Sequence, residues 1–324
     1  CMFHGSDSRP PFLDGQTMAA DRGVSIDQCV AFAAQRRANI ALLSRYAHIM
    51  VDSPLAAHFH VSRCVNVLAI GIPFAQRAVD DAPLTQRSAT RILHSPSHPE
   101  TKGTPLVRRA IESLRARGHD IDYVEITGQP HDVVMRELRS CDLVVDQAYS
   151  DTPMAGFATE AAGFGRAVVV GTLGVEQFER WIRPDDLPPT RCVVPERIED
   201  AIAELLDDPV SRDALGARAR TFVTSHRDPA VVAARFIRLF TGDVPDEWWF
   251  DPADVTYTGG CGSPAVIRRT IRAVVEQRGP AALQLEDKPS LRDAIIRFGY
   301  DEGPVPTSTA PVHHTDAVSA PFPS

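Results

Sequence analysis

The stretch from residue 90 to residue 208 alternates short apolar runs with longer amphipathic segments, and this alternation limits the possible folds more than any other feature. Buried strands are predicted at 90–95, 120–128, 142–147, 166–171 and 191–195. Helical patterns occur at 103–119, 130–141, 156–165 and 196–208. Strands that alternate with helices in this way predict a parallel sheet covered on both faces, which is the doubly wound α/β class.

The residues before this stretch predict a second, smaller set of α/β elements. Residues 25–47 carry apolar side chains at three- and four-residue intervals, and Ser25 is a suitable N-cap for this helix. Further elements are expected as a strand at 48–53, a helix-like segment at 54–61 and a strand at 65–73. Residues 75–87 are polar and aperiodic, so they are expected to link the two domains.

Four segments are therefore expected along the chain. They are a partial Rossmann-like domain at 1–80, a complete one at 90–225, C-terminal helices at 226–300, and a tail at 303–324. Three helices are expected at 209–226, 228–242 and 263–279, with a packed loop between the last two. The tail is rich in Pro, Ser and Thr and is expected to be disordered, so His313 and His314 are given no function.

Composition excludes several classes of protein. The 324 residues carry a formal net charge of -8, which does not favour binding to nucleic acid. No apolar run is long enough to span a bilayer, and no signal peptide opens the sequence, so a cytoplasmic protein is expected, with peripheral contact to a membrane left open. The six cysteines are scattered without zinc spacing, which favours reduced thiols and no metal site.

The sequence opens on CMFHGSD, in which an apolar stub leads directly into a His-Gly-Ser turn. This pattern is typical of the end of a strand and the loop that follows it. We therefore expect an upstream part of the first domain to be missing, and a chain without that part need not be active.

In an open α/β sheet, ligands bind beyond the carboxyl ends of the strands, so the loops at 94–104, 127–131, 146–157 and 171–174 are the candidate sites. Lys102 and Gly103 stand just before a helix start, which suits an anion such as phosphate. The structural alternative is that Gly103 only opens a tight turn and that Lys102 is solvated. Neither a dinucleotide-binding glycine motif nor a P-loop is present.

Three stretches in order, ILHSPSHPETKGT, DLVVDQ and GFATEAAGFGRAVVVG, carry a more specific signal. Together they resemble the C-terminal, donor-binding domain of the retaining nucleotide-sugar glycosyltransferases with the GT-B fold. The opening FHGSD resembles a loop in the N-terminal domain of that family. The resemblance implies two Rossmann-like domains, the first of them incomplete here, with the C-terminal helices returning to the first.

The resemblance also implies roles for individual residues. Glu160 would accept hydrogen bonds from the ribose hydroxyls of the donor, and Lys102 with Gly103 would neutralise the departing diphosphate. His4 would lie beside the donor sugar, near the reaction centre. Gly128 would lie in the loop that runs past the nucleotide base. Gly156, Phe157 and Ala158 would direct their backbone N–H groups toward the diphosphate.

Two positions depart from the family pattern. Thr152 stands where an acidic residue often contacts the sugar, with Asp151 next to it, and Pro96 stands where the family often has an arginine. Both departures weaken the usual donor contacts.

The implied function is a metal-independent glycosyltransferase that moves a sugar from a nucleoside diphosphate to a glycan, lipid or small-molecule acceptor with retention of configuration. No cofactor is implied beyond the nucleotide-sugar co-substrate. Two alternatives stay open: a sugar-nucleotide-binding protein that no longer catalyses, and a nucleotide-sugar epimerase or phosphorylase on the same fold.

Overall fold

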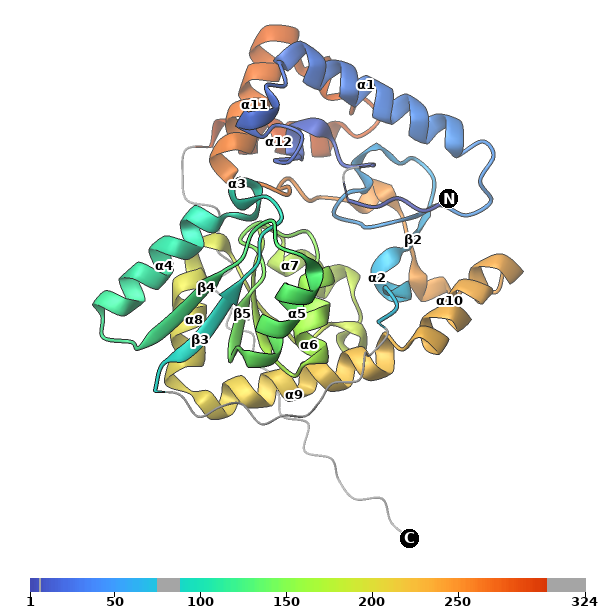
Figure 1. Cartoon of the computed structure of the whole chain (residues 1–324). Helices are drawn as coiled ribbons and strands as arrows, with labels where there is room; N and C mark the ends of the chain where they lie inside the picture. The colour runs from blue at the N-terminus through green and yellow to red at the C-terminus, as the bar shows by residue number, and fades with distance from the viewer. Residues whose placement is uncertain (6, 75–87, 302–324) are drawn as a thin grey trace.

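The larger sheet has five parallel strands in the order β4-β3-β5-β6-β7 (Figure 1). The strands are β3 (Thr90–His94), β4 (Ile121–Glu125), β5 (Leu143–Val145), β6 (Ala167–Gly171) and β7 (Arg191–Val193). From β3 the chain moves outward to β4 and then returns past β3 to β5. The strand order therefore reverses between β3 and β5, and in sheets of this kind ligands bind outside that reversal. The computed structural model describes residues 1–5, 7–74 and 88–301.

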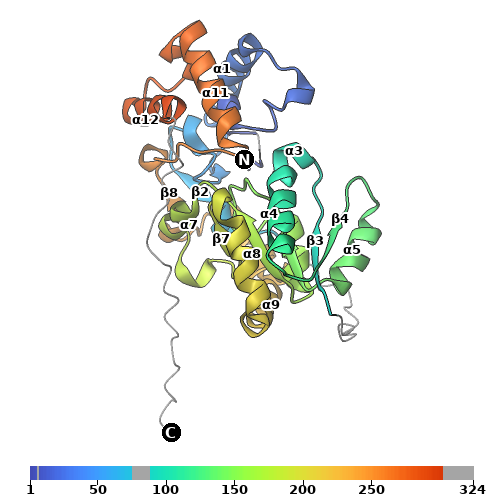
Figure 2. The same ribbon diagram turned by 90° about the vertical axis from the view of Figure 1, so that its left-hand side faces the viewer.

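Helices cover both faces of this sheet (Figures 1 and 2). One face carries α4 (Thr104–Ala116) and α8 (Ile198–Asp207), and the other carries α5 (His131–Ser140), α6 (Gly156–Gly163) and α9 (Pro209–His226). Successive strand residues point to opposite faces. In β5, Leu143 and Val145 therefore join the first apolar layer while Val144 joins the second, and all three are fully buried. The predicted doubly wound α/β class is confirmed.

A second, smaller sheet lies in the other part of the molecule. It consists of β1 (Val51–Asp52), β2 (Cys64–Asn66) and β8 (Trp249–Phe250), with β1 and β2 parallel and β8 antiparallel. Met2 forms a parallel bridge to Val51, so the opening residues do run as a strand end beside β1. The structure thus has two separate sheets, and the smaller one includes β8 from the C-terminal part of the chain.

Three helices cover the smaller sheet in the upper layer of Figure 1: α1 (Ile26–Leu43), α11 (Pro264–Arg278) and α12 (Pro289–Tyr300). Ser25 caps α1 through a reciprocal pair of hydrogen bonds with Gln28, which confirms the predicted N-cap. Residues far apart in sequence, including Phe12, Ile40 and Ile295, share one apolar cluster. The C-terminal helices therefore complete the core of the first part of the chain.

The loop after β6 connects the two parts. Phe178 of α7 (Val175–Trp181) packs in the apolar cluster of the smaller part, and the Asn66 amide donates a hydrogen bond to the Trp181 carbonyl at 2.7 Å. On the other side, Arg235 of α10 (Pro229–Thr241) donates to the Ile70 carbonyl at 3.0 Å. These contacts fix the smaller part against the larger sheet.

Several local predictions were wrong. The strand expected at 65–73 ends at Asn66, because the Asn66 side chain caps the short helix α2 (Val67–Ile70) by accepting a hydrogen bond from the Leu68 N–H. The helix expected at 54–61 is only a 3₁₀ turn at Ala57–Phe59. The loop expected after α10 contains β8, and α7 and α12 were not predicted.

The linker at 75–87 and the tail at 303–324, with His313 and His314, lie outside the described residues. The boundaries of the four expected segments stay predictions.

Candidate functional site

The carboxyl edge of the larger sheet brings together the loops that lead into α4, α5 and α6. Because the strands are parallel, the residues after β3, β4 and β5 all lie at this edge. Lys102 stands before α4, His131 is the first residue of α5, and Glu160 lies one turn into α6. This edge is therefore the candidate site.

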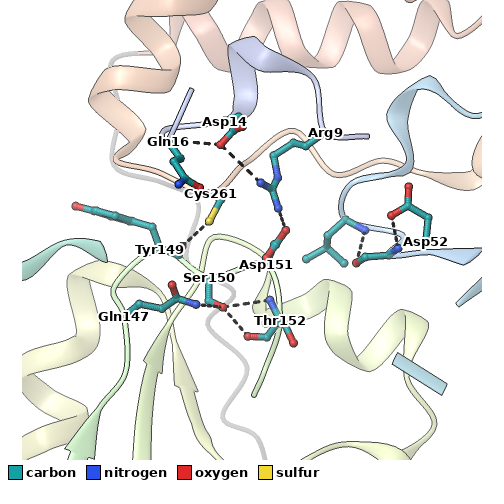
Figure 3. Close-up of polar contacts among 12 residues, drawn as sticks. Arg9, Asp14, Gln16, Asp52, Gln147, Tyr149, Ser150, Asp151, Thr152 and Cys261 are labelled. Atoms are coloured by element: carbon teal, nitrogen blue, oxygen red, sulfur yellow. Dashed lines mark hydrogen bonds and ion pairs between the residues drawn. The ribbon is translucent and has the colours of Figure 1, made fainter. Parts of the chain in front are cut away.

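Lys102 is the last residue of α3 (Pro99–Lys102) and lies over the end of β5. Its ammonium group donates a hydrogen bond to the side-chain oxygen of Gln147, and its carbonyl accepts one from the Ala148 N–H at 2.8 Å. The Gln147 amide then donates to the Ser150 hydroxyl at 2.8 Å, and that hydroxyl donates to the Thr152 carbonyl at 2.7 Å (Figure 3). The Lys102 charge is thus joined by polar contacts to the loop that leads into α6.

A buried carboxyl group lies beside this lysine. Asp146 follows β5 directly and is 6% exposed. Burial raises its pKa to about 6, while the Lys102 charge acts in the opposite direction. Within the described residues, Asp146 Oδ2 has no hydrogen-bond partner. The edge therefore holds a carboxyl group that changes its charge near neutral pH.

Two of the glycines predicted in the site are explained by backbone geometry. Gly103 has φ of 75°, and a Cβ added there would lie 2.4 Å from the Ala148 Cβ. A tight turn and close packing therefore account for Gly103, which favours the structural alternative for this residue. Gly128 is exposed, has φ of 68°, and would meet nothing within 4 Å, so only its backbone conformation calls for glycine.

The start of α6 is open to a ligand. Among the residues that the structure describes, no side chain caps the helix at Ala155, its first turn has no acidic residue, and a Cβ added at Gly156 would meet nothing within 4 Å. The first N–H groups of a helix lack intrahelical partners and carry partial positive charge. Ala158 is buried in the apolar layer and Phe157 packs partly against it. At this helix start, the backbone groups and not these two side chains therefore face outward.

A buried arginine supports this helix start from inside the protein. Arg227 is 7% exposed, and its guanidinium donates to the Thr159 hydroxyl at 2.9 Å. Burial lowers its pKa to about 10, so it remains charged at neutral pH. Nothing in the sequence marked Arg227 as part of the site, because its partner lies 68 residues away.

Glu160 has a partner that the sequence did not reveal. Its Oε1 lies 2.7 Å from the Nε2 of His131, and the two side chains are 30% and 55% exposed. Within the described part of the chain, no partner of Oε2 is found. Glu160 and Lys102 thus lie at one edge of the sheet, but each contacts its own neighbouring loop.

His4 lies at the carboxyl end of the strand-like segment that pairs with β1. Its backbone N–H donates to the Asp7 carboxylate at 3.0 Å, and its carbonyl accepts from the Asp7 N–H at 3.0 Å. The side chain is exposed. These bonds are those of a turn, and they leave the imidazole open to solvent.

The same loop reaches the larger sheet through Arg9. Its guanidinium forms an ion pair with Asp151, which precedes α6, and also lies 3.7 Å from the Asp14 carboxylate (Figure 3). Beside this pair, the Cys261 thiol donates to the Tyr149 carbonyl at 3.2 Å. The Cys261 carbonyl accepts from the Gly15 N–H at 2.9 Å, and the Cys261 N–H donates to the Leu13 carbonyl at 3.2 Å. The glycine-rich loop at 259–263 is therefore a packing element between the two parts.

The structure brings Lys102, Gly103, Gly128, Gly156, Phe157, Ala158 and Glu160 to one sheet edge, with His4 on the facing part of the chain. Within residues 1–5, 7–74 and 88–301, no group of three His, Cys, Asp or Glu side chains is arranged to hold a metal ion. A search for membrane spans in the same residues finds no helix with the required length and apolar character.

Comparisons with known proteins give limited similarity. No protein-family model matches the chain, and no curated protein matches it. Among solved structures, the glycosyltransferase SnogD from Streptomyces nogalater matches at 12% identity and a TM-score of 0.32, over 59% of this chain and 57% of that one. The glycotransferase of kitacinnamycin matches at 15% identity and a TM-score of 0.37, over 70% and 68%.

The chain thus spans little more than half the length of SnogD.

Proposed function

We propose that this protein binds a nucleoside diphosphate sugar at the carboxyl edge of the larger sheet and transfers the sugar to an acceptor. The observation that carries the proposal is the uncapped start of α6 at Gly156, with Lys102 on one side of the same edge and Glu160 one turn along the helix. A diphosphate needs positive charge and free N–H groups, and a ribose diol needs a carboxylate.

The diphosphate would take the N–H groups of the first turn of α6, which Gly156 leaves accessible. Lys102 would give up its neutral partner Gln147 for a phosphate oxygen, because a charge-assisted hydrogen bond is stronger than one to an amide. The same charge would stabilise the departing nucleoside diphosphate as the bond to the sugar breaks. Arg227 would add positive charge behind the helix start.

The ribose would bind Glu160 through Oε2 while Oε1 keeps its contact with His131. A carboxylate held by a neighbouring side chain loses less conformational entropy on binding. His4 would stand near the sugar from the facing part of the chain. The sequence resemblance adds three points to this proposal: the configuration is retained, the acceptor is a glycan, lipid or small molecule, and no metal ion is needed.

A second candidate is a sugar-nucleotide-binding protein without transfer activity. One observation favours it: Asp151, the acidic residue nearest to the expected sugar-contacting position, forms an ion pair with Arg9. Thr152 offers a hydroxyl group in place of a carboxylate.

The test is calorimetric titration of the protein with a panel of nucleoside diphosphates and the matching nucleosides. Binding of at least one diphosphate, more tightly than its nucleoside, is expected. Absence of binding across the panel would exclude both candidates. Release of nucleoside diphosphate from a bound donor then separates the transferase from the inactive binding protein, and a changed sugar on the intact donor would indicate an epimerase.

A further inference from the structure

A groove of about 690 Å³ runs along α1 in the smaller part of the molecule. This volume lies within the range of small-molecule binding sites. None of the residues assigned to the nucleotide site lines it. We propose that this groove binds a small molecule that carries a carboxylate or phosphate group next to an apolar ring.

One wall of the groove is a single face of α1. Phe32, Gln35, Arg36 and Asn39 follow the i, i+3, i+4, i+7 spacing, so their side chains lie on the same side of the helix. The opposite wall comes from the segment before α1, which includes Thr17, Arg22 and Val24. A helix face and a chain segment that run side by side form a groove open along its length.

The charge in the groove is positive. Arg22 and Arg36 line it, and no carboxylate does. Arg22 is exposed, and among the described residues its guanidinium has no ion pair or hydrogen bond. Two guanidinium groups in one groove are suited to an oxyanion: the exposed Arg22 can donate two parallel hydrogen bonds to it, and Arg36 adds a second positive charge.

Arg36 is held in position before any ligand arrives. Its Nη1 donates to the Arg9 carbonyl at 2.6 Å, its Nη2 donates to the Thr17 hydroxyl at 3.1 Å, and its side chain is 19% exposed. The nearest carboxylate, Asp14, is 3.8 Å away and receives a shorter hydrogen bond, of 2.6 Å, from Thr17. The Arg36 charge is therefore only partly neutralised, and its position is fixed.

The other lining residues indicate which groups the ligand carries besides the anionic one. Phe32 is 36% exposed and Val24 is partly exposed, so they give the groove an apolar surface on which a ring can pack. Gln35 and Asn39 add amide groups that can donate to or accept from hydroxyl groups. An inorganic anion would use only the arginines, whereas a ring-bearing anion would use both kinds of contact.

The position of the groove separates it from the nucleotide site. Arg22 also lines a small neighbouring cavity, together with Asp21 and with His98 to Thr101, which include Glu100 and belong to the segment that ends at Lys102. The ligand would therefore bind on the far side of Arg22 from α3 and leave Lys102 free. This inference does not use the sugar-nucleotide proposal.

The experiment measures binding of four probes to the whole protein by calorimetry and ligand-observed NMR. The probes are 1-naphthyl phosphate, 1-naphthoate, 1-naphthol and inorganic phosphate. We expect at least one of the two ring-bearing anions to bind roughly tenfold or more tightly than both 1-naphthol and inorganic phosphate. The preference between the two anions identifies the oxyanion.

The variants Arg22→Ala and Phe32→Ala should each weaken that binding, the first by about tenfold. Arg45→Ala is the matched control, because Arg45 is an exposed arginine outside the groove, and it should bind like wild type. Three results would overturn the inference: neither anion binds at millimolar concentration, Arg22→Ala binds like wild type, or a nucleoside diphosphate displaces the probe.

Discussion

Arg9 and Asp151 form an ion pair that joins the opening loop of the chain to the loop before α6 (Figure 3). The side chain of Arg9 is 3% exposed and that of Asp151 is 19% exposed, so the pair is largely shielded from water. Asp151 is next to Thr152 in the sequence, and Thr152 is the position where the resemblance placed a sugar contact. The ion pair therefore holds the two parts of the molecule together. It also engages the Asp151 carboxylate, which is the acidic group nearest to the position where the resemblance places the sugar.

Asp151→Asn should destabilise the protein by about 1.5–3 kcal/mol, because a buried guanidinium loses its charged partner. Asp14, 3.7 Å from Arg9, limits the loss. Urea unfolding measures the change. The control is Asp186→Asn, which breaks an ion pair with the half-exposed Arg183 and should cost less than about 1 kcal/mol. Equal losses in the two variants would show that the Arg9 pair has no special role.

Lys102→Ala should weaken binding of a nucleoside diphosphate by about tenfold, while affinity for the matching nucleoside stays close to wild type. The reason is that the proposed partner of Lys102 is a phosphate oxygen. Calorimetric titration with both ligands checks this. Lys288→Ala serves as a charge-matched control, since Lys288 donates to the His58 carbonyl in the smaller part of the protein. Loss of nucleoside affinity in Lys102→Ala would contradict the assigned role.

Glu160→Gln should lower nucleoside affinity by roughly tenfold, because a neutral amide binds a diol less strongly than a carboxylate does. His131→Ala removes the present partner of Glu160 but leaves the carboxylate, so its nucleoside affinity should change by less than Glu160→Gln does. Both side chains are partly exposed, and unfolding free energies should fall by less than about 1 kcal/mol. A larger affinity loss in His131→Ala would mean that histidine, not glutamate, contacts the ligand.

Asp146 should make the protein less stable as the pH rises from about 4 to about 6. Burial raises the folded-state pKa of this carboxyl group from 3.8 to about 6, so between these values the folded state holds a proton that the unfolded state releases. The penalty is complete above the folded pKa and amounts to about 3 kcal/mol. Asp146→Asn should therefore be more stable than wild type at pH 7, with the difference vanishing below pH 4. A stability difference between wild type and Asp146→Asn that does not change with pH would refute the raised pKa of Asp146.

Lys288 should have the opposite pH dependence in an alkaline window. Burial lowers its folded-state pKa from 10.5 to about 8, so the unfolded state binds more protons between these values and stability rises with pH. Relative to Lys288→Met, wild type should gain about 2 kcal/mol from pH 8 to pH 10. The buried cysteines contribute equally to the pH dependence of unfolding in both proteins, so their contribution cancels in the difference. Parallel stability profiles would rule out a depressed lysine pKa.

The sequence predicted the larger sheet well, because periodicity is local information. Every strand from β3 to β7 falls inside its expected run, and the alternation of Leu143, Val144 and Val145 between two apolar layers follows from the strand period. Most of the failures are short elements, although the helix α12 at Pro289–Tyr300 was also not predicted. β8 has only two residues and exists because it pairs with β2, and Asn66 stops a strand by capping a helix.

The candidate site was predicted only as a set of loops. Strand order brings those loops together, so Lys102 and Glu160 could be placed at one edge from the α/β pattern alone. Their partners could not be placed. The contacts of His131 with Glu160 and of Arg227 with Thr159 join residues 29 and 68 positions apart, and single residues of these types carry no sequence signal.

The pairing of Cys64 with Phe250 has a consequence for the order in which the newly made chain folds. All strands of the larger sheet leave the ribosome before Trp249 does, and each strand after β3 can pair at once with a strand that is already present. Residues 1–66 are made before the larger sheet, yet they must wait for β8 and for Ile271 and Ile295 to complete their sheet and their apolar cluster. We therefore expect folding during synthesis to begin in the larger sheet, with the core of the smaller part completed only after the last helices have been made.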